Sequence, residues 1–193
     1  KAMFNDAGFA GRFQLSAVNS INWARLMAQV VYYFYAAVRL GAPGRKAAFA
    51  VPTGNFGDVF AGYVAHAMGL PVERLIVATN VNDILPRTLK TGIYEVRDVH
   101  ASASPSMDIQ VSSNFERLLF EASRRDAASV RRLMDSLKQS GRFVLPDAML
   151  AAIREEFDAG RADETETAAA IRAAWREAGD LVDPHTAVAL AVA

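Results

Sequence analysis

The sequence contains no cysteine, few tryptophans and histidines, and no excess of charge of either sign. Without cysteine the chain can form no disulfide, no catalytic thiolate and no cysteine-ligated metal site. His66, His100 and His185 are far apart in the sequence, so the short ligand spacing of a zinc site is missing. The 21 basic and 21 acidic residues cancel, which gives no indication of a nucleic-acid partner or an anionic membrane partner.

Long apolar runs are missing as well. No apolar segment reaches the ~18 residues that a membrane-spanning helix needs, and no secretory signal pattern opens the chain. The chain has 193 residues, of which 52% are hydrophobic, and this is enough for one core of ordinary size. We therefore expect a cytoplasmic protein with no membrane segment.

Both ends of the sequence read as cut. The first residues carry no helix cap, and the apolar residues after Asp183 and Pro184 run to Ala193 without a glycine or a polar last turn. Asp183 is expected to cap this last helix, with Pro184 at its first position. We expect a piece of a longer chain.

Residues 19–40 carry the strongest helix signal. Asn19 or Ser20 can cap this helix, and Gly41 is a plausible stop. Its apolar residues recur at steps of three and four, which is typical of a helix that faces a core. They are Trp23, Leu26, Met27, Val30, Val31, Phe34 and Val38.

A strand, a helix and a second strand follow within a short distance. The apolar segment 46–52 predicts a buried strand, residues 58–68 predict a helix that stops at Gly69, and residues 74–80 predict another buried strand. This βαβ pattern implies a parallel sheet. The fold class is therefore predicted to be α/β, a parallel sheet with flanking helices.

The rest of the chain gives weaker signals. The stretch from Asn80 to Asp98 reads mainly as loop, with Pro86 and Gly92 as breakers. A capping box of Ser113 and Glu116 predicts the next helix. Residues 127–179 read as three helical segments broken at Gly141, Pro146 and Gly160, the last one capped by Asp163 and Glu166.

These signals suggest a division of the chain. We predict that residues 1–126 form part of an α/β core and that residues 127–180 form a helical elaboration without sheet strands. Residues 181–193 are predicted to begin a helix that returns to the core.

The segment PTGNFGD joins the first predicted strand to the next helix. A helix begins with N–H groups that lack partners inside the helix, and glycines let a ligand approach them, so this loop suits a phosphate. The sequence has neither G-x-G-x-x-G nor G-x-x-x-x-G-K-[ST] at this position. A cofactor anchored by its phosphate fits better than a nucleotide, and a tight turn that needs glycine for its dihedral angles is the alternative.

Several phrases in order along the chain together resemble the threonine synthase family. They are NSINWARLMAQVVYYF, VPTGNFGDVFAGYVAHAMGLP, ATNVNDIL, LKTGIYE, PSMDIQVSSNFERLLFE and DPHTAVA. The resemblance implies an enzyme of the tryptophan synthase β-like fold, fold-type II, with pyridoxal 5'-phosphate (PLP) as cofactor. It also implies a lyase of the aspartate-family pathway that converts O-phospho-L-homoserine and water to L-threonine and phosphate.

The resemblance further implies that the catalytic lysine is not in this chain. In the family, the lysine that forms the Schiff base with PLP lies in a Phe-Lys-Asp phrase, upstream of the matched phrases. Lys1, Lys46, Lys90 and Lys138 are the lysines present, and none lies in such a phrase. We therefore predict no catalytic residue in the chain and an inactive fragment.

The family's PLP-phosphate loop matches this sequence residue by residue at Gly54, Asn55, Phe56, Gly57 and Asp58. Main-chain N–H groups are expected to bind the phosphate, with a side-chain donor from Asn55. Asp58 would repel a phosphate, so its expected role is to cap the helix from the first turn.

Eight further residues are substrate-binding candidates. Asn22 opens the first long helix, Asn82 and Asp83 follow the second strand, and a second helix start after residue 111 could receive the substrate phosphate. Capping, turn formation or a solvated loop explains each of them equally well. The eight candidates are Asn22, Asn82, Asp83, Arg87, Lys90, Ser112, Ser113 and Asn114.

Other functions compete with this interpretation. A serine/threonine dehydratase or a cysteine synthase also binds the cofactor phosphate with a glycine-rich loop. These enzymes generally lack the phrases NSINWAR and SMDIQVSSNFERLLF. A non-catalytic domain that binds a phosphate ligand is the alternative from a different class, and a Rossmann-type oxidoreductase fits the glycine spacing poorly. The expected partner is a small-molecule substrate, and the protein is expected to be a monomer or a homodimer.

Overall fold

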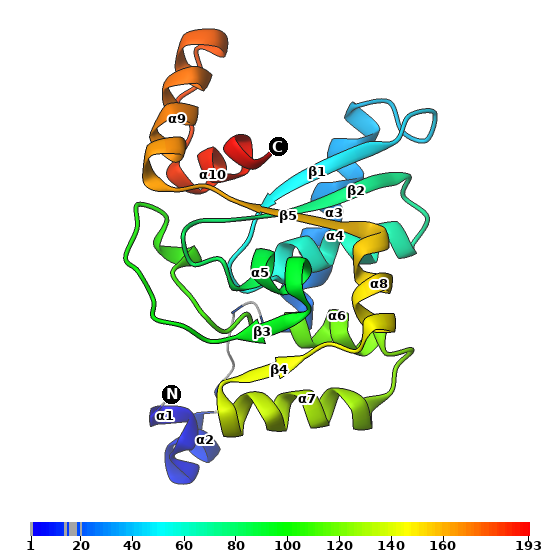
Figure 1. Ribbon diagram of the computed structural model, residues 1–193, viewed down its shortest axis with the longest axis vertical. Helices are drawn as coiled ribbons and strands as arrows, with labels where there is room; N and C mark the ends of the chain where they lie inside the picture. Colours follow the sequence, from blue (N-terminus) through cyan, green and yellow to red (C-terminus); the bar gives the residue numbers. More distant parts are fainter. Residues whose placement is uncertain (1, 14, 16–18, 20) are drawn as a thin grey trace.

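A three-stranded parallel sheet forms the centre of the molecule (Figure 1). The computed structural model describes residues 2–13, 15, 19 and 21–193. The sheet consists of β1 (Ala47–Pro52), β2 (Val72–Thr79) and β5 (Phe157–Arg161), in the order β1-β2-β5. The predicted βαβ unit is confirmed, because α4 (Gly57–Ala67) joins β1 to β2 and the two strands pair in parallel.

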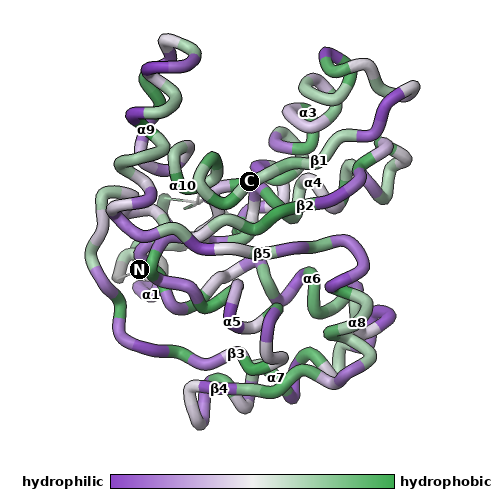
Figure 2. The backbone as a smooth tube through the Cα atoms, turned by 45° about the horizontal axis from the view of Figure 1, so that its top comes forward, coloured by the Kyte–Doolittle hydropathy of each residue, from purple (hydrophilic) through white to green (hydrophobic). Residues whose placement is uncertain are grey.

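The two faces of this sheet are covered by different helices. On β2, Leu75 and Val77 point into the main core, whereas Ala78 points to the other face. The main core also includes residues of α3 (Trp23–Arg39), α5 (Ile84–Thr91), α6 (Phe115–Ala122) and α8 (Asp147–Glu156). The opposite face packs against α10 (Pro184–Val192), which in turn contacts α9 (Glu164–Ala178). In Figure 2, β1 and α10 are largely hydrophobic, whereas the long connection after β3 is mostly hydrophilic.

A small antiparallel sheet lies beyond the main core. It pairs β3 (Ile93–Glu95) with β4 (Arg142–Val144), next to α7 (Ala127–Ser140). The rings of Tyr94 and Phe143 stack across this sheet, with their centroids 4.7 Å apart. The remaining elements are α1 (Ala2–Asn5), α2 (Ala7–Phe13) and a 3-10 turn at Pro105–Met107. No helix in the described part of the chain is long and apolar enough to cross a membrane.

The loop predicted for the region around Pro86 and Gly92 is wrong, because α5 and β3 lie there. Pro86 is the third residue of α5, and in the first turn a proline removes no intrahelical hydrogen bond. Gly92 ends α5 with φ 76°, a left-handed conformation that suits glycine.

The prediction that residues 127–180 contain no core strand is also wrong. Three helices form as predicted, but β5 lies between α8 and α9 and pairs with β2 in parallel. Gly160 lies in this strand and faces α10, where an added Cβ would meet Cγ1 of Val192 at 2.6 Å. The domain division itself stays a prediction.

The helix caps confirm some of the expected positions and correct others. Asp163 and Glu166 form the predicted capping box, and Asp183 caps α10 with Pro184 in its first turn. The capping box of Ser113 and Glu116 is wrong, because Asn114 is the N-cap of α6 and makes no side-chain cap bond.

The cap of α3 is Asn22 rather than Asn19. The Oδ1 of Asn22 accepts from the N–H of Ala24 at 3.0 Å, whereas that of Asn19 accepts from the N–H of Ile21. Ser20 lies outside the described residues.

Replacing Gly62 by alanine is expected to loosen the contact between α3 and α4. An added Cβ would lie 2.6 Å from Cε1 of Tyr33 and 2.8 Å from Cδ2 of Leu75. Overpacking of this kind costs about 1–3 kcal/mol, which outweighs the ~1 kcal/mol that alanine gains over glycine inside a helix. We expect a lower urea midpoint of unfolding. Gly11→Ala in α2 is the matched control, since nothing lies within 4 Å of its added Cβ. If both variants lowered the urea midpoint by the same amount, the packing argument would be contradicted.

Candidate functional site

The loop between β1 and α4 lies at the carboxyl end of the sheet, where ligands of open α/β sheets bind. An added Cβ at Gly54 would collide with the carbonyl oxygen of Ser106 and lie 3.3 Å from its carbonyl carbon, so glycine is required here. Phe56 has φ 63°, a left-handed conformation that is strained for an aromatic residue. Its buried ring packs against Phe115 and Phe157, with centroid distances of 5.3 and 5.7 Å, and this packing holds the strained turn.

The main-chain N–H groups of this loop are available to a ligand. Within the described chain, none of the N–H groups from Gly54 to Asp58 donates a hydrogen bond. They lie at the start of α4, where the helix dipole favours a negative charge. We call the segment from Gly54 to Asp58 the cradle, because this arrangement suits an anion such as a phosphate.

The segment 112–114 supports the cradle from behind. The Oγ of Ser112 donates to the carbonyl of Gly54 at 2.7 Å. The main-chain N–H and the side-chain Nδ2 of Asn114 both donate to the carbonyl of Asn55, at 3.0 and 2.9 Å. Ser113 donates to Oδ1 of Asn55 at 3.3 Å. Ser112 and Asn114 are buried and hold the loop in place, whereas Ser113 is partly exposed.

Arg117 connects this support to the start of α3. Its Nε donates to Oδ1 of Asn114 at 2.9 Å, and its Nη2 donates to the carbonyl of Ile21 at 2.9 Å. The guanidinium also lies over the ring of Trp23, 5.6 Å from the centroid. The segment that contains Asn22 is therefore fixed to the cradle through Asn114.

Asn82 belongs to a buried network that fastens the 96–111 connection to the end of β2. Its Nδ2 donates to the carbonyl of His100 at 2.8 Å, and its Oδ1 accepts from the N–H of the same residue at 2.8 Å. Asn80, also buried, donates to Oδ1 of Asp108 at 2.7 Å and to Oγ of Ser102 at 2.7 Å. Burial acts to raise the pKa of Asp108. Hydrogen bonds from Ser102 and Asn80 outweigh this effect and hold the pKa below its usual value.

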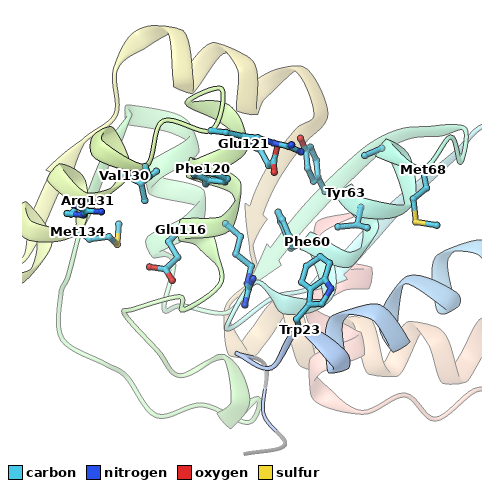
Figure 3. A pocket seen from close by; sticks show the side chains of 15 residues that line it. Trp23, Phe60, Tyr63, Met68, Glu116, Phe120, Glu121, Val130, Arg131 and Met134 are labelled. Carbon is cyan, nitrogen blue, oxygen red and sulfur yellow. The ribbon is translucent and has the colours of Figure 1, made fainter.

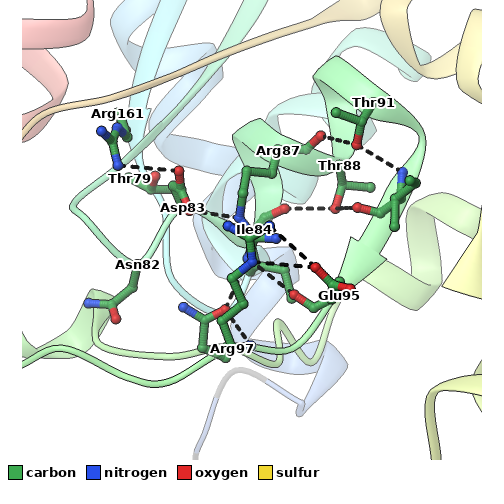
Figure 4. A network of polar contacts seen from close by, with 12 residues as sticks. Thr79, Asn82, Asp83, Ile84, Arg87, Thr88, Thr91, Glu95, Arg97 and Arg161 are labelled. Atoms are coloured by element: carbon green, nitrogen blue, oxygen red, sulfur yellow. Dashed lines mark hydrogen bonds and ion pairs between the residues drawn. The ribbon is translucent and has the colours of Figure 1, made fainter. Parts of the chain in front are cut away.

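Asp83, the N-cap residue of α5, and Arg87 of that helix form a separate charged cluster (Figure 4). Nε of Arg87 lies 2.8 Å from Oδ1 of Asp83, and Nη1 of Arg161 lies 3.4 Å from Oδ2 of the same carboxylate. The other end of Arg87 donates to the carbonyl of Glu95 at 3.1 Å. Asp83, Arg87 and the exposed Lys90 line a cavity of about 570 Å³ beside the edge strand β5.

Asp58 lies in the first turn of α4, as predicted, but no capping hydrogen bond from its side chain is found in the described structure. Its Oδ1 is buried and has no hydrogen-bond partner among the described residues. The hydroxyl of Tyr33 donates instead to the main-chain carbonyl of Asp58, at 2.9 Å. Burial raises the pKa of the Asp58 carboxyl, an effect that the nearby Tyr33 hydroxyl partly offsets. Burial, reinforced by the charge of Asp58, raises the pKa of Tyr33 well above its usual value.

His185, in the first turn of α10, also reaches the surroundings of the cradle. Its Nε2 accepts from the N–H of Ser106 at 3.4 Å, and its Nδ1 lies 3.0 Å from Oδ1 of Asp183. Ser106 is the residue whose carbonyl lies against Gly54. The start of α10 and the cradle are thus connected through one residue.

No lysine of the described chain lines the cradle. Lys46 precedes β1 at the opposite end of the strand, and Lys90 and Lys138 are exposed on α5 and α7. Lys1 lies outside the described residues. No group of three or more acidic or histidine side chains in the described part of the molecule could hold a metal ion. The cradle can therefore bind an anionic group, but the described residues around it include no amine nucleophile.

A large cavity lies elsewhere, between the start of α3, α4, α6 and α7 (Figure 3). It has a volume of about 840 Å³, and aromatic residues such as Trp23, Phe60 and Tyr63 line it beside the charged Glu121 and Arg131. None of the site residues predicted from the sequence lines this cavity.

Sequence reasoning missed several residues that shape the cradle. Ser106, Asn80 and Asp108 lie in or near phrases that carry the family resemblance, but no local pattern shows that they meet Gly54 and Asn82. Arg117 has a recognisable position three residues after a helix cap, and its contact with Ile21 spans 96 residues. Such contacts depend on the tertiary fold, which one sequence does not reveal.

Comparisons with known proteins agree with the resemblance predicted from the sequence. No protein-family model matches the chain. Threonine synthase from Pseudomonas aeruginosa is 53% identical over 193 residues, which is 100% of this chain and 41% of that protein. The chain therefore spans about two fifths of the length of this relative.

Solved structures show the same relationship. The crystal structure of PLP-bound threonine synthase from Brucella melitensis superposes with a TM-score of 0.96 at 62% identity, over 99% of this chain and 41% of that one. Serine racemase from Dictyostelium discoideum superposes with a TM-score of 0.58 at 14% identity, over 98% of this chain and 50% of that one, a likeness of fold alone. The α/β fold and the resemblance to threonine synthase are thus confirmed over the whole chain.

Proposed function

We propose that this chain is part of a threonine synthase and supplies the cradle that binds the phosphate of PLP. The parent enzyme would convert O-phospho-L-homoserine and water to L-threonine and phosphate, in the cytoplasm and within the aspartate-family pathway. The proposal rests on the identity over the whole chain to threonine synthases, one of them solved with PLP bound.

The arrangement of the cradle is the observation that carries the proposal. Its N–H groups have no partner in the described structure, and Gly54 brings the backbone against Ser106 where a side chain has no room. A phosphate bound there would accept several N–H bonds at the positive end of α4. Asn55, at the tip of the loop, is exposed and can add its side-chain amide.

PLP would supply the electron sink for the carbanion chemistry when it is bound. The residues of this chain would bind and orient it. Ser112 and Asn114 hold the cradle by its carbonyls, which leaves the N–H groups pointed at the ligand. Phe56 closes the core side of the loop with a buried ring.

The substrate-binding role of the eight candidate residues is part of this proposal. Asn22 and Asn82 are bound to the same framework as the cradle, through Arg117 and the 96–111 connection respectively. Arg87 and Lys90 lie beside the β5 edge, and the cation of Arg87 is already paired with Asp83. We therefore favour the partly exposed Asn22 and Ser113 as groups that approach the substrate. Arg87 is paired with Asp83, and the buried amide of Asn82 is already bonded to His100.

Borohydride reduction of the chain with PLP, followed by peptide mapping, tests where the catalytic lysine lies. We expect no stoichiometric label at any single lysine, because none of the described lysines lines the cradle. The isolated chain is therefore expected to be inactive. A clean single label on Lys46, Lys90 or Lys138 would contradict this assignment, and pyridoxal without phosphate is the control for non-specific amine labelling.

A second candidate function is a non-catalytic domain that binds a phosphate ligand, since the cradle alone supports binding and not catalysis. The sequence of the parent gene separates the two: a Phe-Lys-Asp lysine upstream supports the enzyme, and its absence supports the binding domain. The partners that we propose are the small-molecule substrate and, at most, a second copy of the same chain.

A further inference from the structure

The first turn of α10 places a charged carboxylate beside the ring of His185. Oδ1 of Asp183 accepts from the N–H of His185 at 2.9 Å, and its Oδ2 accepts from Oγ1 of Thr186 at 2.6 Å. The bond from Thr186 is the main reason why the pKa of Asp183 is lowered to about 2. Asp183 is therefore ionised at neutral pH, and its position is fixed by the helix that it caps.

Asp183 determines which nitrogen of the His185 ring can accept a hydrogen bond. Nδ1 of His185 lies 3.0 Å from Oδ1 of Asp183. A carboxylate can only accept, so this bond requires the proton of the neutral ring to be on Nδ1. Nε2 then carries no proton and accepts from the main-chain N–H of Ser106, at 3.4 Å. Both contacts therefore require the same tautomer of the neutral ring.

Ser106 connects this contact to the cradle. It lies in the 3-10 turn Pro105–Met107, and its carbonyl oxygen occupies the space that a Cβ on Gly54 would need. The next residue, Met107, is buried against Val188 of α10. The turn is thus held between α10 and the cradle, and a shift of Ser106 would change the space in which Gly54 lies.

Helix capping does not account for the ring of His185. Asp183 caps α10 through main-chain N–H groups, which a residue with any side chain would supply. A second carboxylate near the ring, Asp108, is bonded by Asn80 and Ser102. On α9, Glu164 lies near the same connection but accepts from the N–H of Ala103. The printed contacts of the ring itself are those with Asp183 and Ser106.

We propose that His185 is a positioning residue for the cofactor. Its ring, oriented by Asp183, holds Ser106 against Gly54 and so keeps the N–H groups of the cradle directed at the phosphate of PLP. This inference rests on the proposed function. Because His185 acts through Ser106 at the phosphate end, its removal is expected to weaken recognition of the phosphate and not of the rest of the cofactor.

His185→Phe in the full-length protein tests the proposal, because phenylalanine keeps an aromatic ring and removes the acceptor. The affinities of the apo-protein for PLP and for pyridoxal are measured by fluorescence titration at pH 8, well above the ordinary histidine pKa of about 6.5. Both compounds carry the same aldehyde, so the comparison isolates the phosphate. We expect PLP to bind about 5- to 10-fold more weakly, as for one lost hydrogen bond, and pyridoxal to bind as before.

Two further variants separate the acceptor from the shape of the side chain. His185→Gln keeps an oxygen that can accept from the N–H of Ser106, and we expect PLP affinity within about threefold of that of the unchanged protein. His66→Phe is the matched control. Nδ1 of His66 also lies 3.0 Å from a carboxylate, that of Glu156, but in the last turn of α4, at the opposite end from the cradle. This variant is expected to leave both affinities unchanged.

Several results would overturn the proposal. They are an unchanged PLP affinity of His185→Phe, an equal loss of affinity for PLP and pyridoxal, and a glutamine variant as weak as the phenylalanine variant. With any of these, the proposed function stands as long as the unchanged protein binds PLP more tightly than pyridoxal. If the unchanged protein binds both equally, the cradle does not bind the phosphate, and the proposed function fails together with this inference.

Discussion

Substitution of Gly54 by alanine is expected to reduce the affinity for PLP by about 100-fold. The added Cβ would collide with the carbonyl of Ser106, so the loop has to move away and the cradle N–H groups lose their common direction. Loss of two charge-assisted hydrogen bonds, at about 1.5 kcal/mol each, corresponds to about 3 kcal/mol and hence to about 100-fold in affinity. Fluorescence titration with PLP measures the effect.

Gly44→Ala is the matched control for this prediction. Gly44 lies in the turn before β1, and its added Cβ would have an ordinary contact of 3.6 Å with the carbonyl of Gly41. This variant is expected to bind PLP as the unchanged chain does. Circular dichroism separates lost binding from lost folding. An affinity of Gly54→Ala within a factor of three of the unchanged protein would contradict the role given to the cradle.

Replacement of Asn80 by alanine is expected to cost about 3–5 kcal/mol of unfolding free energy. Asn80 is 1% exposed, and its side chain bonds Asp108, Ser102 and the N–H of Asn82. Removing it leaves several buried polar groups without partners, each worth about 1–3 kcal/mol. Urea denaturation measures the loss.

The exposed Asn5 at the end of α1 supplies the control, Asn5→Ala, for which we expect less than ~0.5 kcal/mol. The Asn80 variant is also expected to show faster hydrogen exchange in residues 100–108, since Asn80 and Asn82 hold this connection to β2. Unchanged exchange there would mean that the network does not fix the connection.

The parts of the fold that follow from local sequence were predicted well. The helix α3, the strands β1 and β2 and the caps at Asp163 and Asp183 all depend on residues close together in the chain. The glycine loop belongs to this group, because a turn between a strand and a helix is a local structure. The predicted core-facing stripe of α3 is only partly right, because Leu26 and Val30 are buried. The other large residues of that stripe are mostly exposed, namely Trp23, Met27, Val31 and Val38.

The parts that depend on distant contacts were not predicted. β5 has the sequence FDAGR, which is short and half polar, and it becomes a strand because it pairs with β2 more than 75 residues away. Asp58 lines a cavity between α3 and β1, and its main-chain carbonyl accepts from the hydroxyl of Tyr33, 25 residues earlier. The contacts of Ser112 and Asn114 with the cradle span 58 and 59 residues. Their side-chain types suggested a ligand site, but the described structure uses them to position the loop.

The most direct test of the cradle is a titration of the ¹⁵N-labelled chain with PLP, followed through the amide resonances. We predict saturable shifts of the amides of Gly54, Asn55, Phe56, Gly57 and Asp58, because their N–H groups have no partner in the described structure and lie at the start of α4. Inorganic phosphate should shift the same resonances with lower affinity. Saturable shifts confined to the cavity around Trp23 and Phe120, with the cradle amides unmoved, would contradict the account.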